Sequence, residues 1–108
     1  MSETNKITKL ILNDLFQRQI FAWRQNVAII PLPNGGFRPG GKSGLPDIIA
    51  ILPPDGKFCG IEIKTGRDRL RPEQIGFQKN LERMGGIYLV VSSYENFLSQ
   101  LDKTYQQF

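Results

Sequence analysis

Residues 44–64, GLPDIIAILPPDGKFCGIEIK, decide the fold of this chain. Two apolar runs, 48–52 and 58–63, flank the tetrapeptide at 53–56, Pro-Pro-Asp-Gly. Proline fixes φ and Asp-Gly accepts a tight reversal, so the tetrapeptide is typical of a turn. The pattern therefore predicts a β-hairpin with strands at 48–52 and 58–64.

The second predicted strand has one charged face and one apolar face. Because side chains alternate along a strand, Glu62 and Lys64 share a face, and the other face carries only Cys59, Ile61 and Ile63. Asp47 opens the first strand of the hairpin, and the start of one hairpin strand lies beside the end of the other. We therefore expect Asp47 close to Glu62 and Lys64.

A fourth polar residue is expected at the same place. Pro72 and Glu73 are typical of a helix start, which predicts a helix over 72–84 that Gly85-Gly86 ends. One stripe of this helix is apolar except at its first position: Gln74, Phe77, Leu81 and Met84. Gln74 should thus face the sheet near the strand ends and hold a carboxylate, although it could instead cap its own helix.

These residues have the chemistry of a metal-dependent phosphodiesterase. Asp47 and Glu62 can ligate one or two Mg²⁺ or Mn²⁺ ions, with the carbonyl of Ile63 as a further ligand. Lys64 can orient the attacking water or stabilise charge in the transition state. A Glu-x-Lys pair alone is more often a cross-strand charge pair, and Pro-Asp alone is more often a turn. Their order, spacing and expected convergence favour a nuclease.

Composition limits the number of domains, the kind of partner and the catalytic chemistries that are open to this chain. The 108 residues fit a single domain, 1–108, and 40% are hydrophobic, as in globular proteins. The net charge of +4 favours a polyanionic partner such as nucleic acid. The chain has one cysteine and no histidine, which excludes intramolecular disulfides, Ser-His catalysis and histidine-ligated zinc. No run approaches a membrane span and no signal-peptide pattern is present, so a cytoplasmic protein is expected.

The remaining elements predict an α/β fold. Helical periodicity indicates a helix over about 4–19, and apolar residues at 27–32 indicate a first strand, short or at an edge because of Pro31 and Pro33. Residues 34–44 are rich in glycine and predict a mobile loop. A buried strand at 87–91 and a helix at 94–105 complete the order helix-strand-strand-strand-helix-strand-helix, with helices flanking a mixed sheet.

Contacts with DNA phosphates are expected from cations around the hairpin. The glycine-rich segment contributes two of them, and the loop at 65–71 contributes three arginines, although such a loop is more commonly a solvated surface. The full set of expected DNA-binding residues is Arg24, Arg38, Lys42, Ser43, Arg67, Arg69 and Arg71.

Three motifs together resemble one known family. Residues 43–49 (SGLPDII), 61–65 (IEIKT) and 71–74 (RPEQ), with flanks at 21–26 and 84–91, are similar to the VRR-NUC domain of the PD-(D/E)xK nuclease superfamily. The resemblance implies a restriction-endonuclease-like fold and dependence on Mg²⁺ or Mn²⁺, with no organic cofactor. By position, Asp47, Glu62 and Lys64 match the catalytic triad, and Gln74 matches the glutamine of the following helix.

The resemblance also implies a substrate. Short stand-alone members are often phage or prophage proteins, whose setting is the host cytoplasm, and they resemble homodimeric nucleases that cut four-way (Holliday) junctions. Cleavage of flaps or splayed arms, a DNA-binding module with weak or no cleavage, and an interaction protein beside a helicase or replisome remain alternatives. Many relatives carry an acidic residue in the first helix that completes the metal site. Here its position is uncertain among Glu3, Thr4 and Asp14, which leaves the second metal open.

Overall fold

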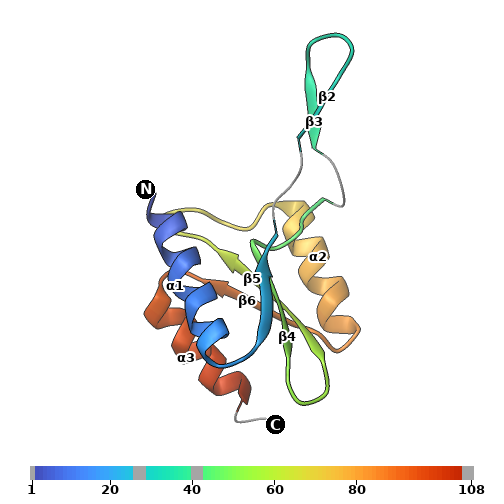
Figure 1. Cartoon of the computed structure of the whole chain (residues 1–108). Helices are drawn as coiled ribbons and strands as arrows, with labels where there is room; N and C mark the ends of the chain where they lie inside the picture. Colours follow the sequence, from blue (N-terminus) through green and yellow to red (C-terminus); the bar gives the residue numbers. More distant parts are fainter. Residues whose placement is uncertain (1, 26–28, 40–42, 106–108) are drawn as a thin grey trace.

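The computed structural model describes residues 2–25, 29–39 and 43–105 (Figure 1). Three helices and six strands lie within these ranges. In chain order they are α1 (Glu3–Gln17), β1 (Phe21–Arg24), β2 (Ile29–Pro31), β3 (Phe37–Pro39), β4 (Ile48–Leu52), β5 (Lys57–Ile63), α2 (Pro72–Arg83), β6 (Ile87–Val91) and α3 (Tyr94–Tyr105).

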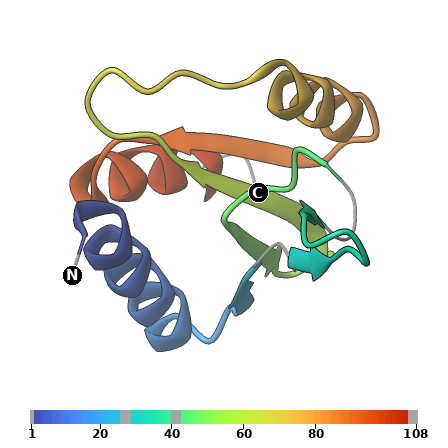
Figure 2. The same cartoon turned by 90° about the horizontal axis from the view of Figure 1, so that it is seen from above.

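Four of the strands form a mixed sheet in the order β1-β4-β5-β6. β1 and β5 pair antiparallel with β4, whereas β6 pairs parallel with β5 through a crossover that contains α2. Seen from above, α2 covers one face of the sheet, and α1 and α3 cover the other (Figure 2). The predicted fold class and the helix-strand order around this sheet are confirmed.

The hydrophobic core lies between the sheet and the pair α1 and α3. It is built from alternate residues of each strand, as the predicted apolar face of the hairpin requires. Its members are buried: Ile7, Ile11, Leu15, Ile20, Ile48, Ala50, Leu52, Cys59, Ile61, Ile63, Leu89, Val91, Phe97 and Leu101. Burial also raises the pKa of the Cys59 thiol to about 12, so this cysteine is an inert core residue.

The first strand of the sheet differs from the prediction. It is β1, directly after α1, and not the segment 27–32. Residues 29–31 instead form β2, which pairs only with β3 in a separate two-stranded sheet. Pro31 and Pro33 lack the N–H that a strand of the main sheet needs, which accounts for this placement. Residues 26–28 lie outside the described part of the chain.

The glycine-rich segment is also more ordered than the prediction of a mobile loop. Phe37–Pro39 forms β3, and the turn before it is closed by two hydrogen bonds, from the Leu32 N–H to the Gly36 carbonyl and from the Gly35 N–H to the Leu32 carbonyl. The glycines therefore serve a hairpin turn, in which Gly35 adopts a positive φ. Residues 40–42, including Lys42, lie outside the described residues.

Candidate active site

The loop before β4 delivers Asp47 to the end of the sheet. Gly44 has a φ of +79°, and a Cβ there would lie 2.2 Å from the backbone oxygen of Glu73. Pro46 crosses over β5, where a Cβ on Gly60 would lie 2.9 Å from the Pro46 ring. Only glycine fits at either position, so these two residues let the loop lie against α2 and β5 just before Asp47.

Asp47 and Glu62 lie side by side, as the hairpin predicted. Ile48 is opposite Ile61, so Asp47 and Glu62 occupy the next position of the antiparallel register. One Asp47 carboxylate oxygen accepts a hydrogen bond of 2.8 Å from the backbone N–H of Ile63. The Asp47 side chain thus extends the β4–β5 ladder by one bond, which fixes the carboxylate against the strand that carries Glu62.

Gln74 performs both roles that the sequence left open. Its amide nitrogen donates to the two Glu62 carboxylate oxygens at 3.1 and 3.4 Å, and its oxygen accepts from the backbone N–H of Arg71 at 2.8 Å. Glu62 and Gln74 are only 2% and 3% exposed. One side chain therefore closes the start of α2 and anchors a buried carboxylate. The rest of the predicted stripe is less buried, and Met84 is exposed.

The environment of Glu62 strongly disfavours its charge. Burial, which is the largest cause, and the adjacent Asp47 carboxylate, which also hydrogen bonds with Glu62, together raise the pKa of Glu62 to about 8, while Lys64 and Arg71 oppose the shift. Two acidic groups in contact within a buried site are unfavourable unless a cation or a proton lies between them. Carboxylate pairs of this kind are typical of functional sites.

Lys64 follows the last residue of β5 at the same end of the sheet. Its backbone N–H donates to the Val91 carbonyl at 2.9 Å, which continues the pairing of β5 with β6. The side chain is partly buried. Its ammonium group lies close enough to Glu62 to favour the ionised carboxylate. The structure thus brings Asp47, Glu62, Ile63, Lys64 and Gln74 together.

The donor set suits a hard divalent cation. Two carboxylates and nearby carbonyl groups are oxygen ligands of the kind that Mg²⁺ and Mn²⁺ prefer. Among residues 2–25, 29–39 and 43–105, no group of three or more acidic, histidine or cysteine side chains forms a larger cluster. The residues therefore fit a cation bound mainly by one carboxylate pair.

The first helix offers no buried third carboxylate. Asp14 binds Arg18 at 2.6 Å and accepts from the Tyr94 hydroxyl at 2.9 Å, so it is part of the α1–α3 packing and not of this site. Glu3 lies in the first turn of α1 and is exposed. That end of α1 is tied to β1, because Arg24 donates to the Asn5 side chain at 2.8 Å.

Sequence reasoning did not single out Tyr88. Tyr88 is on β6, opposite Gly60 of β5, and its side chain is 6% exposed. It lies on the same face of the sheet as Glu62. Its hydroxyl has no hydrogen-bond partner among the described residues. Burial raises the pKa of the phenol, and the Glu62 and Asp47 carboxylates raise it further. A tyrosine within an apolar strand is common in any buried sheet, so the sequence alone did not indicate that Tyr88 lies beside the acidic pair.

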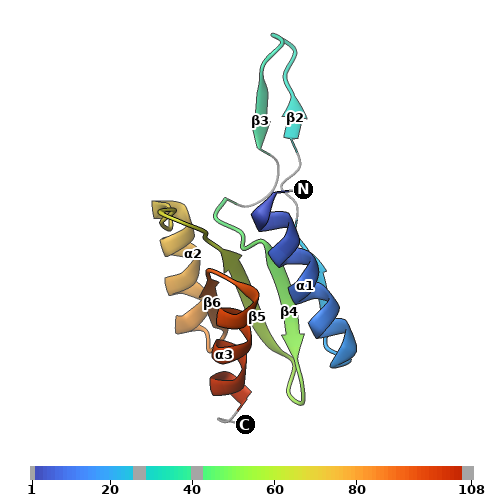
Figure 3. The same ribbon diagram turned by 90° about the vertical axis from the view of Figure 1, so that its left-hand side faces the viewer.

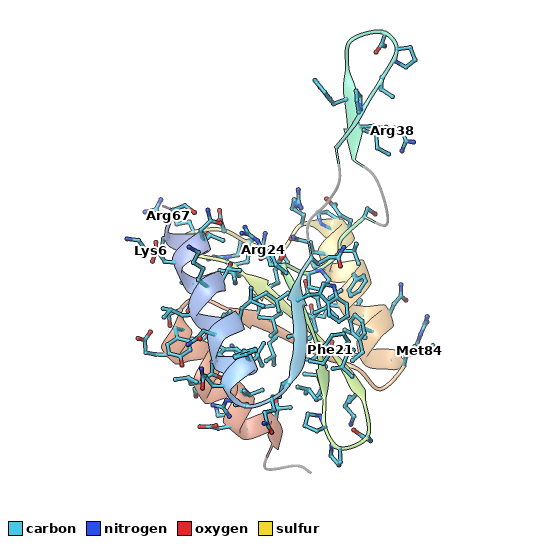
Figure 4. The ribbon with its side chains drawn as sticks, in the orientation of Figure 1. Lys6, Phe21, Arg24, Arg38, Arg67 and Met84 are labelled. Atoms are coloured by element: carbon cyan, nitrogen blue, oxygen red, sulfur yellow. The ribbon has the colours of Figure 1, made fainter. Side chains whose placement is uncertain are left out.

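The expected DNA-binding residues fall into several groups. Arg67, Arg69 and Arg71 lie in the exposed loop after β5, where Arg69 donates to the Arg67 and Asp68 carbonyls and Arg71 lies 3.6 Å from Glu73. Arg24 and Ser43 are exposed near the site, and Arg38 lies on β3. Figure 4 shows Lys6, Arg24 and Arg67 near the same end of the molecule, with Arg38 beyond them.

Comparison with known proteins supports one family. The family model described as the VRR-NUC domain matches residues 4–95. A solved structure described as a VRR_NUC domain is similar over 100% of this chain and 99% of that chain, with a TM-score of 0.68 and 19% sequence identity. A search of curated proteins gives no match. In the part of the chain that the structure describes, no helix is long and apolar enough to cross a membrane.

Proposed function

This chain belongs to the VRR-NUC domain family, and on that premise we propose that it is a Mg²⁺- or Mn²⁺-dependent endonuclease of branched DNA. The family indicates nuclease activity with DNA as the substrate. The observation that carries the proposal is the pair of Asp47, which is partly buried, and Glu62, which is buried, held by the Ile63 N–H and the Gln74 amide. Two acidic groups lie in contact there although burial and their mutual repulsion oppose the ionisation of both, which favours a catalytic role over a structural one.

In this proposal each residue has a separate task. Asp47 and Glu62 hold the cation, with the Ile63 carbonyl as a further ligand, and Gln74 keeps the Glu62 carboxylate in one orientation. Lys64 places a positive charge where the phosphate becomes more negative during hydrolysis. A cation held by these residues would supply Lewis-acid chemistry at the phosphate and would lower the pKa of a nearby water.

The substrate in this proposal is a four-way junction, cut by a homodimer. A two-fold dimer presents two sites to a two-fold junction, so that each site nicks one strand.

The exposed outer strand of the sheet supports self-association: Phe21 on β1 is 71% exposed, and its ring lies 5.3 Å from that of Trp23. On the opposite edge strand, β6, one backbone carbonyl is already bonded, because Gln100 donates to the Val90 carbonyl at 2.8 Å.

The dimer surface is tested by measuring molar mass in solution. Phe21→Ser should shift the protein from dimer to monomer, because it removes an exposed aromatic ring from the outer strand. Leu10→Ser is the matched control, since Leu10 is exposed on α1. A monomeric wild-type protein, or a Phe21→Ser protein that stays dimeric, would contradict this surface.

The substrate is tested by cleavage of labelled four-way junctions, linear duplexes and splayed arms of the same sequence. Symmetric nicks on the junction in Mg²⁺ or Mn²⁺ are expected. Cleavage of splayed or flapped DNA alone would identify a flap nuclease, and binding of all substrates without any product would identify a non-catalytic DNA-binding module.

A further inference from the structure

The two-stranded sheet forms an arm that stands apart from the domain. We define the arm as residues 29–39, which comprise β2, β3 and their turn. Figures 1 and 3 show it projecting from the end of the main sheet. Its strands are in register from Ile29 opposite Pro39 to Pro31 opposite Phe37, and they contact each other but no other helix or strand of the described chain.

The packing of the domain does not account for the arm. An isolated two-stranded hairpin is at best marginally stable in water and gains no support here from the core. Even so, its turn is well defined: the Leu32 N–H donates to the Gly36 carbonyl at 2.7 Å, and the Gly36 N–H donates to the Asn34 side chain at 3.0 Å. The arm also presents a bulky apolar side chain to solvent, because Phe37 is 69% exposed.

The described residues that flank the arm on either side in the sequence, Gln25 and Asp47, meet at the candidate active site. The chain leaves the main sheet after β1 and returns to it at Asp47, and the Gln25 N–H donates to the Asp47 carbonyl at 2.7 Å. The projection thus starts from the sheet end that carries the two carboxylates (Figure 3). DNA bound at Asp47 would therefore lie at the end of the sheet from which the arm projects.

The charge around the arm suits a polyanion. Residues 25–46 contain two cations, Arg38 and Lys42, and no acidic residue. Arg38 follows Phe37 on β3, and because side chains alternate along a strand, the two side chains project from opposite faces of the arm. An exposed aromatic ring on one face can stack on a base while a cation on the other face contacts a backbone phosphate, and these are the two kinds of contact that bind unpaired nucleic acid. A second copy of this chain would require no such excess of positive charge.

We propose that the arm enters the branch point of the DNA, where Phe37 stacks on a base at the end of a helical arm and Arg38 contacts a phosphate. This inference rests on the proposed function and adds the element that selects branched DNA. Insertion into a linear duplex requires the unstacking of a base step, which opposes binding. At a branch the stack is already interrupted, so the same contact is made without that cost.

The test uses the catalytically inactive Asp47→Asn protein with and without Phe37→Ala, and with Phe37→Tyr as the aromatic control. Binding to a four-way junction and to linear duplex is measured in Mg²⁺, with 2-aminopurine at the branch as a stacking probe. Phe37→Ala should weaken junction binding about tenfold, leave duplex binding unchanged and abolish the change in 2-aminopurine fluorescence. Phe37→Tyr should behave as the parent.

Three results would overturn the inference. The first is an equal loss of affinity for junction and duplex when Phe37 is replaced by Ala, and the second is no loss of affinity for either. The third is a Phe37→Ala protein of altered molar mass, which would make the arm a contact between two copies. Failure of the proposed function is separate: wild-type protein would give no product from any substrate, whatever Phe37→Ala does to binding.

Discussion

The two faces of the central sheet differ in the polar groups that they bury. The face under α1 and α3 is a continuous apolar core, in which Ile48, Ile61 and Val91 are fully buried. The face under α2 buries Glu62, Gln74 and the hydroxyl of Tyr88, and within α2 itself Gln74 is the one buried residue. One face therefore stabilises the fold, and the other holds polar groups whose burial opposes stability, as expected of a functional site.

This comparison is tested most strongly at Lys64, on the polar side. Lys64→Ala should lower the single-turnover rate of junction cleavage by at least about 100-fold, because a positive charge at the reacting phosphate is removed. Junction affinity should remain near that of the wild type. Lys79→Ala, an exposed change on α2, is the control. Retained cleavage would remove Lys64 from the mechanism.

On the apolar face, the expected effect is on stability. Ile61→Ala should lower the free energy of unfolding by about 2–5 kcal/mol, because a fully buried side chain is replaced by a cavity. Ile75→Ala, at a partly exposed position on α2, should cost less than about 1 kcal/mol. Urea denaturation measures both. Equal losses would show that burial of Ile61 adds no more stability than a surface side chain does.

The raised pKa of Glu62 predicts a dependence of stability on pH. In metal-free buffer the unfolded chain ionises Glu62 near its ordinary pKa of 4.5, whereas the folded chain keeps the proton until about pH 8. The stabilising contribution is complete below about pH 4.5 and is lost as the pH rises towards 8. Glu62→Gln should make the stability of the fold depend less on pH between about pH 4.5 and 8.

Thermal denaturation between pH 4 and 9 in EDTA measures the effect. Glu82→Gln, on the exposed side of α2, is the matched control. A decline that is unchanged in Glu62→Gln would show that other groups cause it. Divalent metal should raise the wild-type melting temperature most at high pH, where the carboxylates are ionised.

The smallest effect is expected at Tyr88. Tyr88→Phe should change the free energy of unfolding by less than about 1 kcal/mol and could increase it, because the buried hydroxyl has no hydrogen-bond partner among the described residues. A loss above about 2 kcal/mol would mean that the hydroxyl makes a bond through water. Tyr94→Phe is a useful contrast, because the Tyr94 hydroxyl donates to Asp14.

The hairpin and its face pattern could be predicted because strand alternation and the turn at 53–56 are local signals. The strand alternation and the turn predicted that Asp47 lies beside Glu62. The apolar stripe of the helix predicted at 72–84 indicated that Gln74 faces the same two carboxylates. Other features depend on tertiary structure. β1 is too short to show periodicity, the β2–β3 pairing crosses a glycine-rich turn, and the crossing of Pro46 over Gly60 involves residues fourteen positions apart in sequence.

The central claim is that the carboxylate pair is a metal-dependent cleavage site. Its most direct test is the cleavage of a labelled four-way junction by wild type and Asp47→Asn, in Mg²⁺, in Mn²⁺ and in EDTA. We predict symmetric nicks by the wild type only with metal, and normal junction binding without product by Asp47→Asn. Cleavage by Asp47→Asn at the wild-type rate, or wild-type cleavage in EDTA, would contradict the account.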